Sequence, residues 1–198
     1  ISDARTLLII GDVSGKGTSA AFHMAQMKGV FHSLVELHPP PHRFLALANS
    51  ALGRCLDRNQ FVTASVFLVD TDKRVIHHAR GGHCPAIFYR SETQQAVFLQ
   101  NKGMGLGLLR KPEYINHVAT KTQSYQPGDW LVLYTDGILE ARNPVGEEFG
   151  EQRLLMFAQR HTNLTTAQFV EAFWAYFRHF CGTAEQQDDY TLVAVKFN

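Results

Sequence analysis

The order of the elements expected along the 198 residues predicts an α+β fold built on antiparallel sheets. The patterns indicate one strand, two helices, a series of strands, two more helices and a last strand. Helices that come in blocks, with strands joined by short turns, favour antiparallel pairing over alternating strand–helix units. No repeat, low-complexity segment or linker interrupts this order, so we expect residues 1–198 to form a single domain.

The first half of the chain supplies a strand, two helices and a hairpin. The apolar segment Arg5–Val13 is long enough for a buried strand and too short for a helix. Glycines break this strand, and Thr18 or Ser19 can cap the helix that follows. The Pro39–Pro41 triplet ends that helix. The next elements are a helix over Arg43–Asp57, which has an apolar stripe, and strands over Phe61–Asp70 and Arg74–Ala79.

The second half of the chain continues with strands and closes with two helices and a strand. Gly103, Gly105 and Gly107 indicate a loop in which backbone segments approach one another closely. The stripe Phe169, Phe173 and Phe177 is more typical of a helix face in the core than of a cofactor site. The expected strands are Ala86–Arg90, Ala96–Leu99, Tyr114–Ser124, Trp130–Thr135 and Tyr190–Phe197, and the expected helices are Glu151–Arg160 and Thr166–Phe180.

Composition excludes several classes of protein. The chain is 45% hydrophobic and 19% charged with a net charge of +1, which excludes intrinsic disorder and argues against a nucleic-acid-binding protein. No apolar run is long enough to span a bilayer. Cys55, Cys84 and Cys181 are far apart, so we expect neither disulfides nor a zinc site, but apolar side chains in or near the core of a cytoplasmic protein. Because Ile1 is not Met, we expect the chain to be part of a longer polypeptide.

Aspartates at strand ends are the strongest chemical signal. Asp12 and Asp136 end apolar runs, and Asp188 and Asp189 precede the last one. Because the end of an antiparallel strand lies beside the start of its neighbour, these acids can meet at one edge of a sheet. Mutual repulsion would be relieved by Mg²⁺ or Mn²⁺, which prefer oxygen ligands. A turn or cap role remains the alternative for each aspartate taken alone.

Glycines and histidines near these acids leave other functions open or exclude them. Gly11 and Gly137 adjoin two of the aspartates and leave room for ions and water. The segment Gly11–Thr18 lacks the spacing of a phosphate-binding P-loop, which excludes that kind of nucleotide site. His83 is either a catalytic residue or a histidine bonded to backbone in a tight turn. His77 and His78 face opposite ways on a strand and cannot bind one ion together.

Taken together, the ordered motifs resemble the PPM-type (protein phosphatase 2C-like) serine/threonine phosphatases, in the bacterial SpoIIE/RsbU-like branch. The segments that carry the resemblance are Gly11–Gly17 with Ala20 and Ala21, Phe61–Ala64, Gly82–Ala86, Gly105–Leu108, Gly128–Gly137, Glu140 with Ala141, Phe149 with Gly150, and Asp188–Val193. The resemblance implies an α-β-β-α sandwich of two antiparallel sheets flanked by helices. It implies that the first strand of the family's fold, which is rich in Gly-Gly-Asp, is lacking here.

The resemblance also implies a site with two Mn²⁺ or Mg²⁺ ions. Asp12 would bridge the ions with the Val13 carbonyl beside it, Asp136 would be the second ligand, and Asp188 the third, with Asp189 as its alternative. A metal-activated water would then attack the phosphorus of a phosphoserine or phosphothreonine. The residues implied to line this site are Gly11, Thr63 and Gly137, with His83 shaping a neighbouring turn.

The family's biology suggests partners. The resemblance implies a phosphorylated STAS-domain anti-sigma factor antagonist as substrate, in two-component signalling or partner switching. It implies that the chain is the C-terminal part of a longer signalling protein with a sensory or receiver domain upstream. The lacking strand would expose a sheet edge able to pair with another chain, as in a homodimer. The alternative hypothesis is a catalytically silent domain that acts as a regulated protein-binding module.

Overall fold

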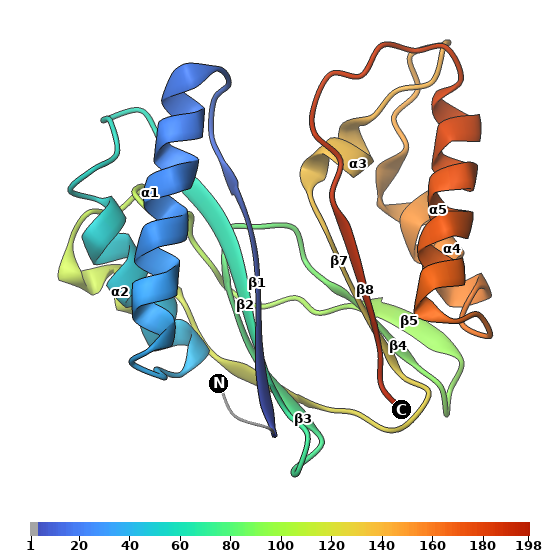
Figure 1. The fold of residues 1–198 in the computed structure, drawn as a ribbon, viewed down its shortest axis with the longest axis horizontal. Coiled ribbons are helices and arrows are strands. Elements are labelled where there is room, and N and C mark those ends of the chain that lie inside the picture. Colours follow the sequence, from blue (N-terminus) through green and yellow to red (C-terminus); the bar gives the residue numbers. More distant parts are fainter. Residues whose placement is uncertain (1–3) are drawn as a thin grey trace. The chain divides into compact units, whose positions relative to one another are not determined.

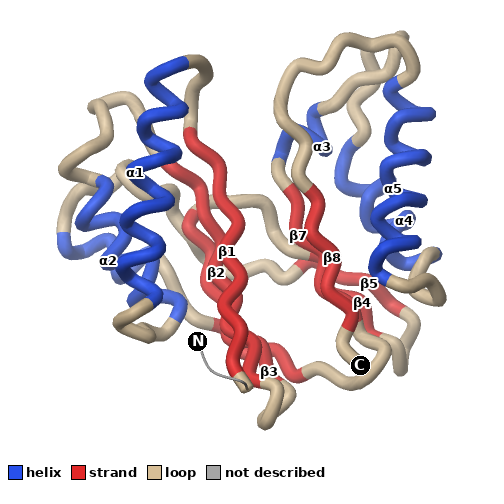
Figure 2. The backbone as a smooth tube through the Cα atoms, viewed as in Figure 1, coloured by secondary structure: helices blue, strands red, loops and turns tan. Residues whose placement is uncertain are grey.

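The computed structural model describes residues 4–198, which form two compact units (Figure 1). Unit 1 contains the residues up to His83 and Asn101–Ser124, and unit 2 contains Cys84–Gln100 and Tyr125–Asn198. Each unit has one four-stranded antiparallel sheet with helices packed beside it (Figure 2). The predicted α+β class with antiparallel sheets is therefore confirmed.

Unit 1 is built on a sheet with the strand order β1-β2-β3-β6. Its strands are β1 (Arg5–Val13), β2 (Val62–Asp70), β3 (Val75–Gly81) and β6 (Lys121–Ser124). Its helices are α1 (Thr18–Val35), α2 (Pro41–Leu52) and the 3₁₀-helix η1 (Pro112–His117). Figure 1 shows α1 and α2 on the same side of this sheet.

The core of unit 1 lies between helix α2 and one face of the sheet. Residues spaced by three and four along α2 turn inward, so Phe44, Ala48 and Leu52 are buried against the sheet. Val62, Ala64 and Val66 alternate along β2 and supply the facing surface. Residues of β2 between these positions, including Thr63, therefore belong to the opposite face of the sheet.

Unit 2 has the strand order β5-β4-β7-β8 and three helices. The strands are β4 (Ile87–Arg90), β5 (Gln95–Phe98), β7 (Trp130–Tyr134) and β8 (Leu192–Lys196). The helices are α3 (Asp136–Glu140), α4 (Gly150–Arg160) and α5 (Thr166–Cys181). Phe169, Phe173 and Phe177 of α5 are all buried in the core of this unit, which confirms their predicted role.

The segment before β6 differs from the prediction. A strand over Tyr114–Ser124 is wrong in its first part, because Pro112 begins the 3₁₀-helix η1 and only Lys121–Ser124 pairs with β3. The Tyr114 hydroxyl donates to the Met104 carbonyl at 2.6 Å, and its ring is buried in the unit 1 core. This tertiary contact stabilises a turn that the β-branched and aromatic residue types do not favour.

The helix boundaries also need correction. The N-cap of α1 is Gly17, without a side-chain hydrogen bond, so neither Thr18 nor Ser19 caps this helix. Helix α2 ends at Leu52 rather than Asp57, and Gly53 follows it. A Cβ atom at residue 53 would lie 2.9 Å from the Asn49 carbonyl oxygen. Gly53 keeps helical dihedral angles, with φ of −60° and ψ of −14°, and its N–H still donates to the Asn49 carbonyl.

The predictions about the burial of the three cysteines and about the His77–His78 pair have different outcomes. Cys55 is exposed, whereas Cys84 and Cys181 are partly buried, so the prediction of three cysteines in or near the core is wrong for Cys55. His77 is partly buried and His78, the next residue of β3, is buried, so their side chains lie on opposite faces of this strand, as predicted. Within residues 4–198, no helix combines the length and the apolar character needed to cross a membrane.

The buried His78 predicts a loss of stability in acid. Burial lowers the pKa of His78 to about 4, and the nearby positive charge of Lys121 acts in the same direction. In the unfolded chain this pKa is about 6.5, so between those values the unfolded state binds a proton that the folded state does not. The stabilisation is fully present above about pH 6.5, and we expect about 3 kcal/mol of it to be lost as the pH falls to 4.

Urea unfolding at pH 7 and pH 4.5 measures this effect. In His78→Phe, which keeps an aromatic ring against Phe67, the pH dependence should be smaller than in the parent chain. His77→Phe, at a partly buried position on the opposite face of the same strand, should keep the parent's pH dependence. Equal pH dependence in the parent chain and His78→Phe would contradict the assignment.

Candidate functional site

In unit 1, the predicted site residues lie at the end of β1 and on the adjoining part of β2. Asp12 is exposed and lies directly opposite Thr63 in the antiparallel register, and Val13 lies opposite Val62. The two strands are close here, because a Cβ atom at Gly11 would lie 2.7 Å from the Thr63 carbonyl oxygen. The structure thus brings Gly11, Asp12, Val13 and Thr63 together on neighbouring strands, as the family resemblance implies.

His83 belongs to the same group through its side chain. Its Nδ1 lies 2.9 Å from the Thr63 hydroxyl, and the residue is only 2% exposed. Its carbonyl oxygen accepts a hydrogen bond of 2.8 Å from Nη1 of Arg80. From the sequence, His83 could be either a catalytic residue or a histidine whose ring bonds to backbone in a tight turn. The contact of the ring with a hydroxyl next to Asp12 is a third arrangement, which nothing in the local sequence indicates.

In unit 2, the remaining acids lie at the neighbouring ends of β7 and β8. Tyr134 lies opposite Leu192 in the antiparallel register. Beyond this pair, the Thr135 N–H donates to the Thr191 carbonyl and the Thr191 N–H donates to the Thr135 hydroxyl, both at 3.2 Å. These bonds hold the segment before β8 beside the start of α3. The predicted meeting of strand ends is confirmed within this unit.

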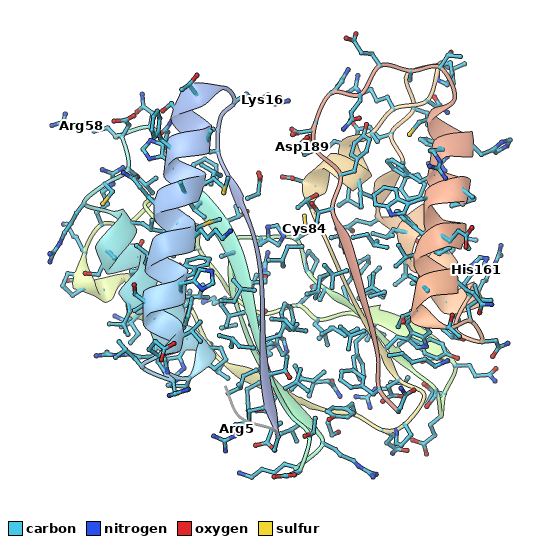
Figure 3. All side chains as sticks on the ribbon, viewed as in Figure 1. Arg5, Lys16, Arg58, Cys84, His161 and Asp189 are labelled. Atoms are coloured by element: carbon cyan, nitrogen blue, oxygen red, sulfur yellow. The ribbon has the colours of Figure 1, made fainter. Side chains whose placement is uncertain are left out.

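Gly137 is the point of closest approach in this group. A Cβ atom at residue 137 would lie 2.4 Å from the Asp189 carbonyl oxygen and 3.4 Å from Cβ of Asp188. Figure 3 labels Asp189 in the segment that leads to β8, beside α3. Asp136, Asp188 and Asp189 are all exposed. The segment that contains Asp188 and Asp189 therefore packs against the residue that follows Asp136, and glycine at residue 137 is required for this approach.

Helix α3 is the element of the site that the sequence analysis missed. It runs over only Asp136–Glu140, and Asp136 is its first residue instead of the end of a strand. The signal was a threonine followed by an acid, which is typical of a helix start. Thr135 precedes the helix without capping it by its side chain, because its hydroxyl accepts the N–H of Thr191.

The residues present suit a hard divalent cation. All the predicted side-chain ligands are carboxylates, which Mg²⁺ and Mn²⁺ prefer. The expectation that Gly11 and Gly137 leave room for ions is wrong, because a Cβ atom there would lie 2.7 Å and 2.4 Å from backbone oxygens, so these glycines allow close backbone packing instead. The acids are divided between the units, with Asp12 in unit 1 and the other three in unit 2. Within residues 4–198, no three His, Cys, Asp or Glu residues form a cluster that could hold a metal ion.

Comparison with known proteins identifies relatives over the whole chain. The family described as Stage II sporulation protein E (SpoIIE) matches residues 2–198. Phosphoserine phosphatase RsbU of Bacillus subtilis (strain 168) is 30% identical over 139 residues, which are 70% of this chain and 40% of RsbU. The chain thus spans about two fifths of this curated relative.

Comparison with solved structures identifies PP2C domains with the same fold as this chain. The SiaA-PP2C domain of Pseudomonas aeruginosa matches with a TM-score of 0.89 at 19% identity, over 100% of this chain and 78% of that one. The catalytic domain of the serine/threonine protein phosphatase PstP, solved in complex with two manganese ions, matches with a TM-score of 0.67 at 12% identity, over 100% and 93% of the two chains. The chain belongs to the SpoIIE family of PP2C-type protein phosphatases.

Proposed function

We propose that this chain is a metal-dependent phosphatase that hydrolyses phosphoserine or phosphothreonine in a partner protein. The observation that carries the proposal is the close packing of the segment with Asp188 and Asp189 against Gly137, the residue that follows Asp136, with all three aspartates exposed. Family membership supports a phosphatase over other metal-dependent hydrolases.

The proposal assigns Asp12, Asp136 and Asp188 as ligands of Mn²⁺ or Mg²⁺. The Val13 carbonyl adds a fourth oxygen, and Asp189 is the alternative to Asp188. Cβ of Asp188 is the one close to Gly137, which favours Asp188 over Asp189. Two ions are proposed because the related PstP structure contains two manganese ions.

The proposed reaction depends on the bound metal and not on a reactive side chain of the protein. When bound, the metal would lower the pKa of a coordinated water and offset charge on the phosphoryl group. The aspartates would hold the metal, and the exposed positions of Asp12 and Asp136 would let a phosphorylated side chain reach these residues. No side-chain nucleophile is needed.

For the substrate, we propose a phosphorylated STAS-domain antagonist in bacterial signalling. The name of RsbU supports phosphoserine as the target. An upstream sensory or receiver domain that controls the activity is part of the same proposal, since this chain spans 40% of RsbU.

Hydrolysis of p-nitrophenyl phosphate and of a phosphoserine peptide tests the proposed activity. We expect both rates to rise with added Mn²⁺, to fall to background with EDTA, and to recover with excess Mn²⁺. Recovery separates removal of the metal from unfolding. Hydrolysis that does not respond to Mn²⁺, or none from the full-length protein, would contradict the proposal and favour a silent binding module.

A further inference from the structure

We propose that His83 is a positioning residue that directs the Thr63 hydroxyl toward the carboxylate of Asp12. In this arrangement the ring N–H at Nδ1 donates to the Thr63 oxygen, and the Thr63 O–H donates to Asp12. The inference rests on the proposed role of Asp12 as a metal ligand, and it goes further by assigning a function to two residues that bind no metal.

The first observation is the strand register. Asp12 and Thr63 are directly opposite each other on β1 and β2. Side chains at opposite positions of an antiparallel pair lie on the same face of the sheet, with Cβ atoms about 4.5–5.5 Å apart. Gly11 and Ala64 are the neighbouring pair on the other face, where Ala64 is buried in the unit 1 core. The Thr63 hydroxyl and the Asp12 carboxylate therefore share the face opposite to α2.

The second observation is the hydrogen bond of 2.9 Å between the Thr63 hydroxyl and Nδ1 of His83. A hydroxyl has one proton to donate, and an ionised carboxylate can only accept. If Thr63 donated to Nδ1, it would present only lone pairs to Asp12. If Nδ1 carries the proton, the Thr63 O–H is available for the carboxylate. The tautomer of His83 thus decides whether Thr63 can support Asp12.

The third observation is that His83 cannot easily turn away. It is 2% exposed, and Nη1 of Arg80 donates to its carbonyl oxygen at 2.8 Å. Nε of the same arginine donates to the Asn101 carbonyl at 3.1 Å, so the guanidinium joins two segments of unit 1. A Cβ atom at Gly82 would lie 2.8 Å from the backbone nitrogen of Gly105. The ring therefore approaches Thr63 from a fixed backbone.

The expected consequence is a change in metal affinity. Groups that hydrogen-bond to metal ligands orient them, and their loss typically costs about 10–100-fold in affinity or activity. A hydroxyl that holds Asp12 in one orientation reduces the freedom that the carboxylate would lose on binding Mn²⁺. His83 acts one step further out, through Thr63.

Titration of the purified chain with Mn²⁺, followed by electron paramagnetic resonance, tests the inference without measuring catalysis. We expect Thr63→Val to raise the dissociation constant for Mn²⁺ by about 10-fold or more, and Thr63→Ser to stay within about 2-fold of the parent. His83→Phe should resemble Thr63→Val, whereas His83→Asn should recover part of the affinity because its amide can donate. Thermal unfolding of each variant checks that it is folded.

Two results would overturn the inference. One is parental Mn²⁺ affinity in a folded Thr63→Val variant while Asp12→Asn loses affinity. The other is a ¹⁵N NMR spectrum of the metal-free protein in which the proton of His83 is on Nε2 and Nδ1 accepts. Parental Mn²⁺ affinity in Asp12→Asn would instead contradict the proposed function. In that case the tautomer of His83 in the NMR spectrum would still show whether Nδ1 donates to the Thr63 hydroxyl.

Discussion

Replacement of Asp136 by Asn should lower the rate of Mn²⁺-dependent phosphoester hydrolysis about 1000-fold, which corresponds to about 4 kcal/mol of lost transition-state stabilisation. The variant removes a charged ligand and keeps nearly the same shape. The free energy of unfolding should change by less than about 1 kcal/mol, because Asp136 is exposed and Asn is also accepted at helix starts. Saturating kinetics with p-nitrophenyl phosphate and urea unfolding measure the two quantities.

Asp129, at the other end of the same strand, provides the matched control. It is 3% exposed, and its carboxylate accepts from the Ser91 N–H at 2.8 Å, the Ser91 hydroxyl at 2.9 Å and the Gln126 N–H at 2.9 Å. In Asp129→Asn one of these acceptors becomes a donor, so the variant should lose about 1–3 kcal/mol of stability. Its rate per folded molecule should be unchanged. An Asp136→Asn variant that keeps a tenth of the parental rate would contradict the assignment.

Replacement of Gly103 by Ala should destabilise the protein by about 4 kcal/mol or more. The added Cβ atom would lie 1.7 Å from the carbonyl oxygen of Arg80 and 2.5 Å from its carbonyl carbon. Both are backbone atoms at the end of β3, where Arg80 pairs with Ser65. Relief of the overlap requires the loop to separate from the strand, which breaks contacts of Arg80 on both sides. Urea unfolding followed by tryptophan fluorescence measures the loss.

Gly29 provides the matched control for this substitution in the same unit. It lies within α1, and a Cβ atom there would meet no other heavy atom within 4 Å. Gly29→Ala should therefore leave stability unchanged or raise it by up to about 1 kcal/mol, since Ala favours the helix. A Gly103→Ala variant within 1 kcal/mol of the parent chain would show that the approach of this loop to β3 does not contribute to stability.

The fold class could be predicted because hydrophobic patterns are local. The β-branched and aromatic residues of β2 are typical of a strand, and the Phe169, Phe173 and Phe177 stripe follows the period of the helix that buries it. The close approach at Gly103 was also predicted, since glycines clustered in a loop indicate contact between backbones. Prediction was wrong where a distant partner determines the conformation, as with Tyr114, whose hydroxyl bonds to Met104.

For the candidate site, too, some features could be predicted from the sequence and others depend on the tertiary structure. The sequence by itself was enough to predict the candidate ligands, because aspartates at strand ends beside glycines form a local pattern that can be recognised without the tertiary structure. Only the tertiary structure decided that Asp136 begins a short helix and that the ring of His83 meets the Thr63 hydroxyl. Each hydroxyl has one proton and a limited set of neighbours, so its partner is fixed by the packing of segments that are distant in the chain.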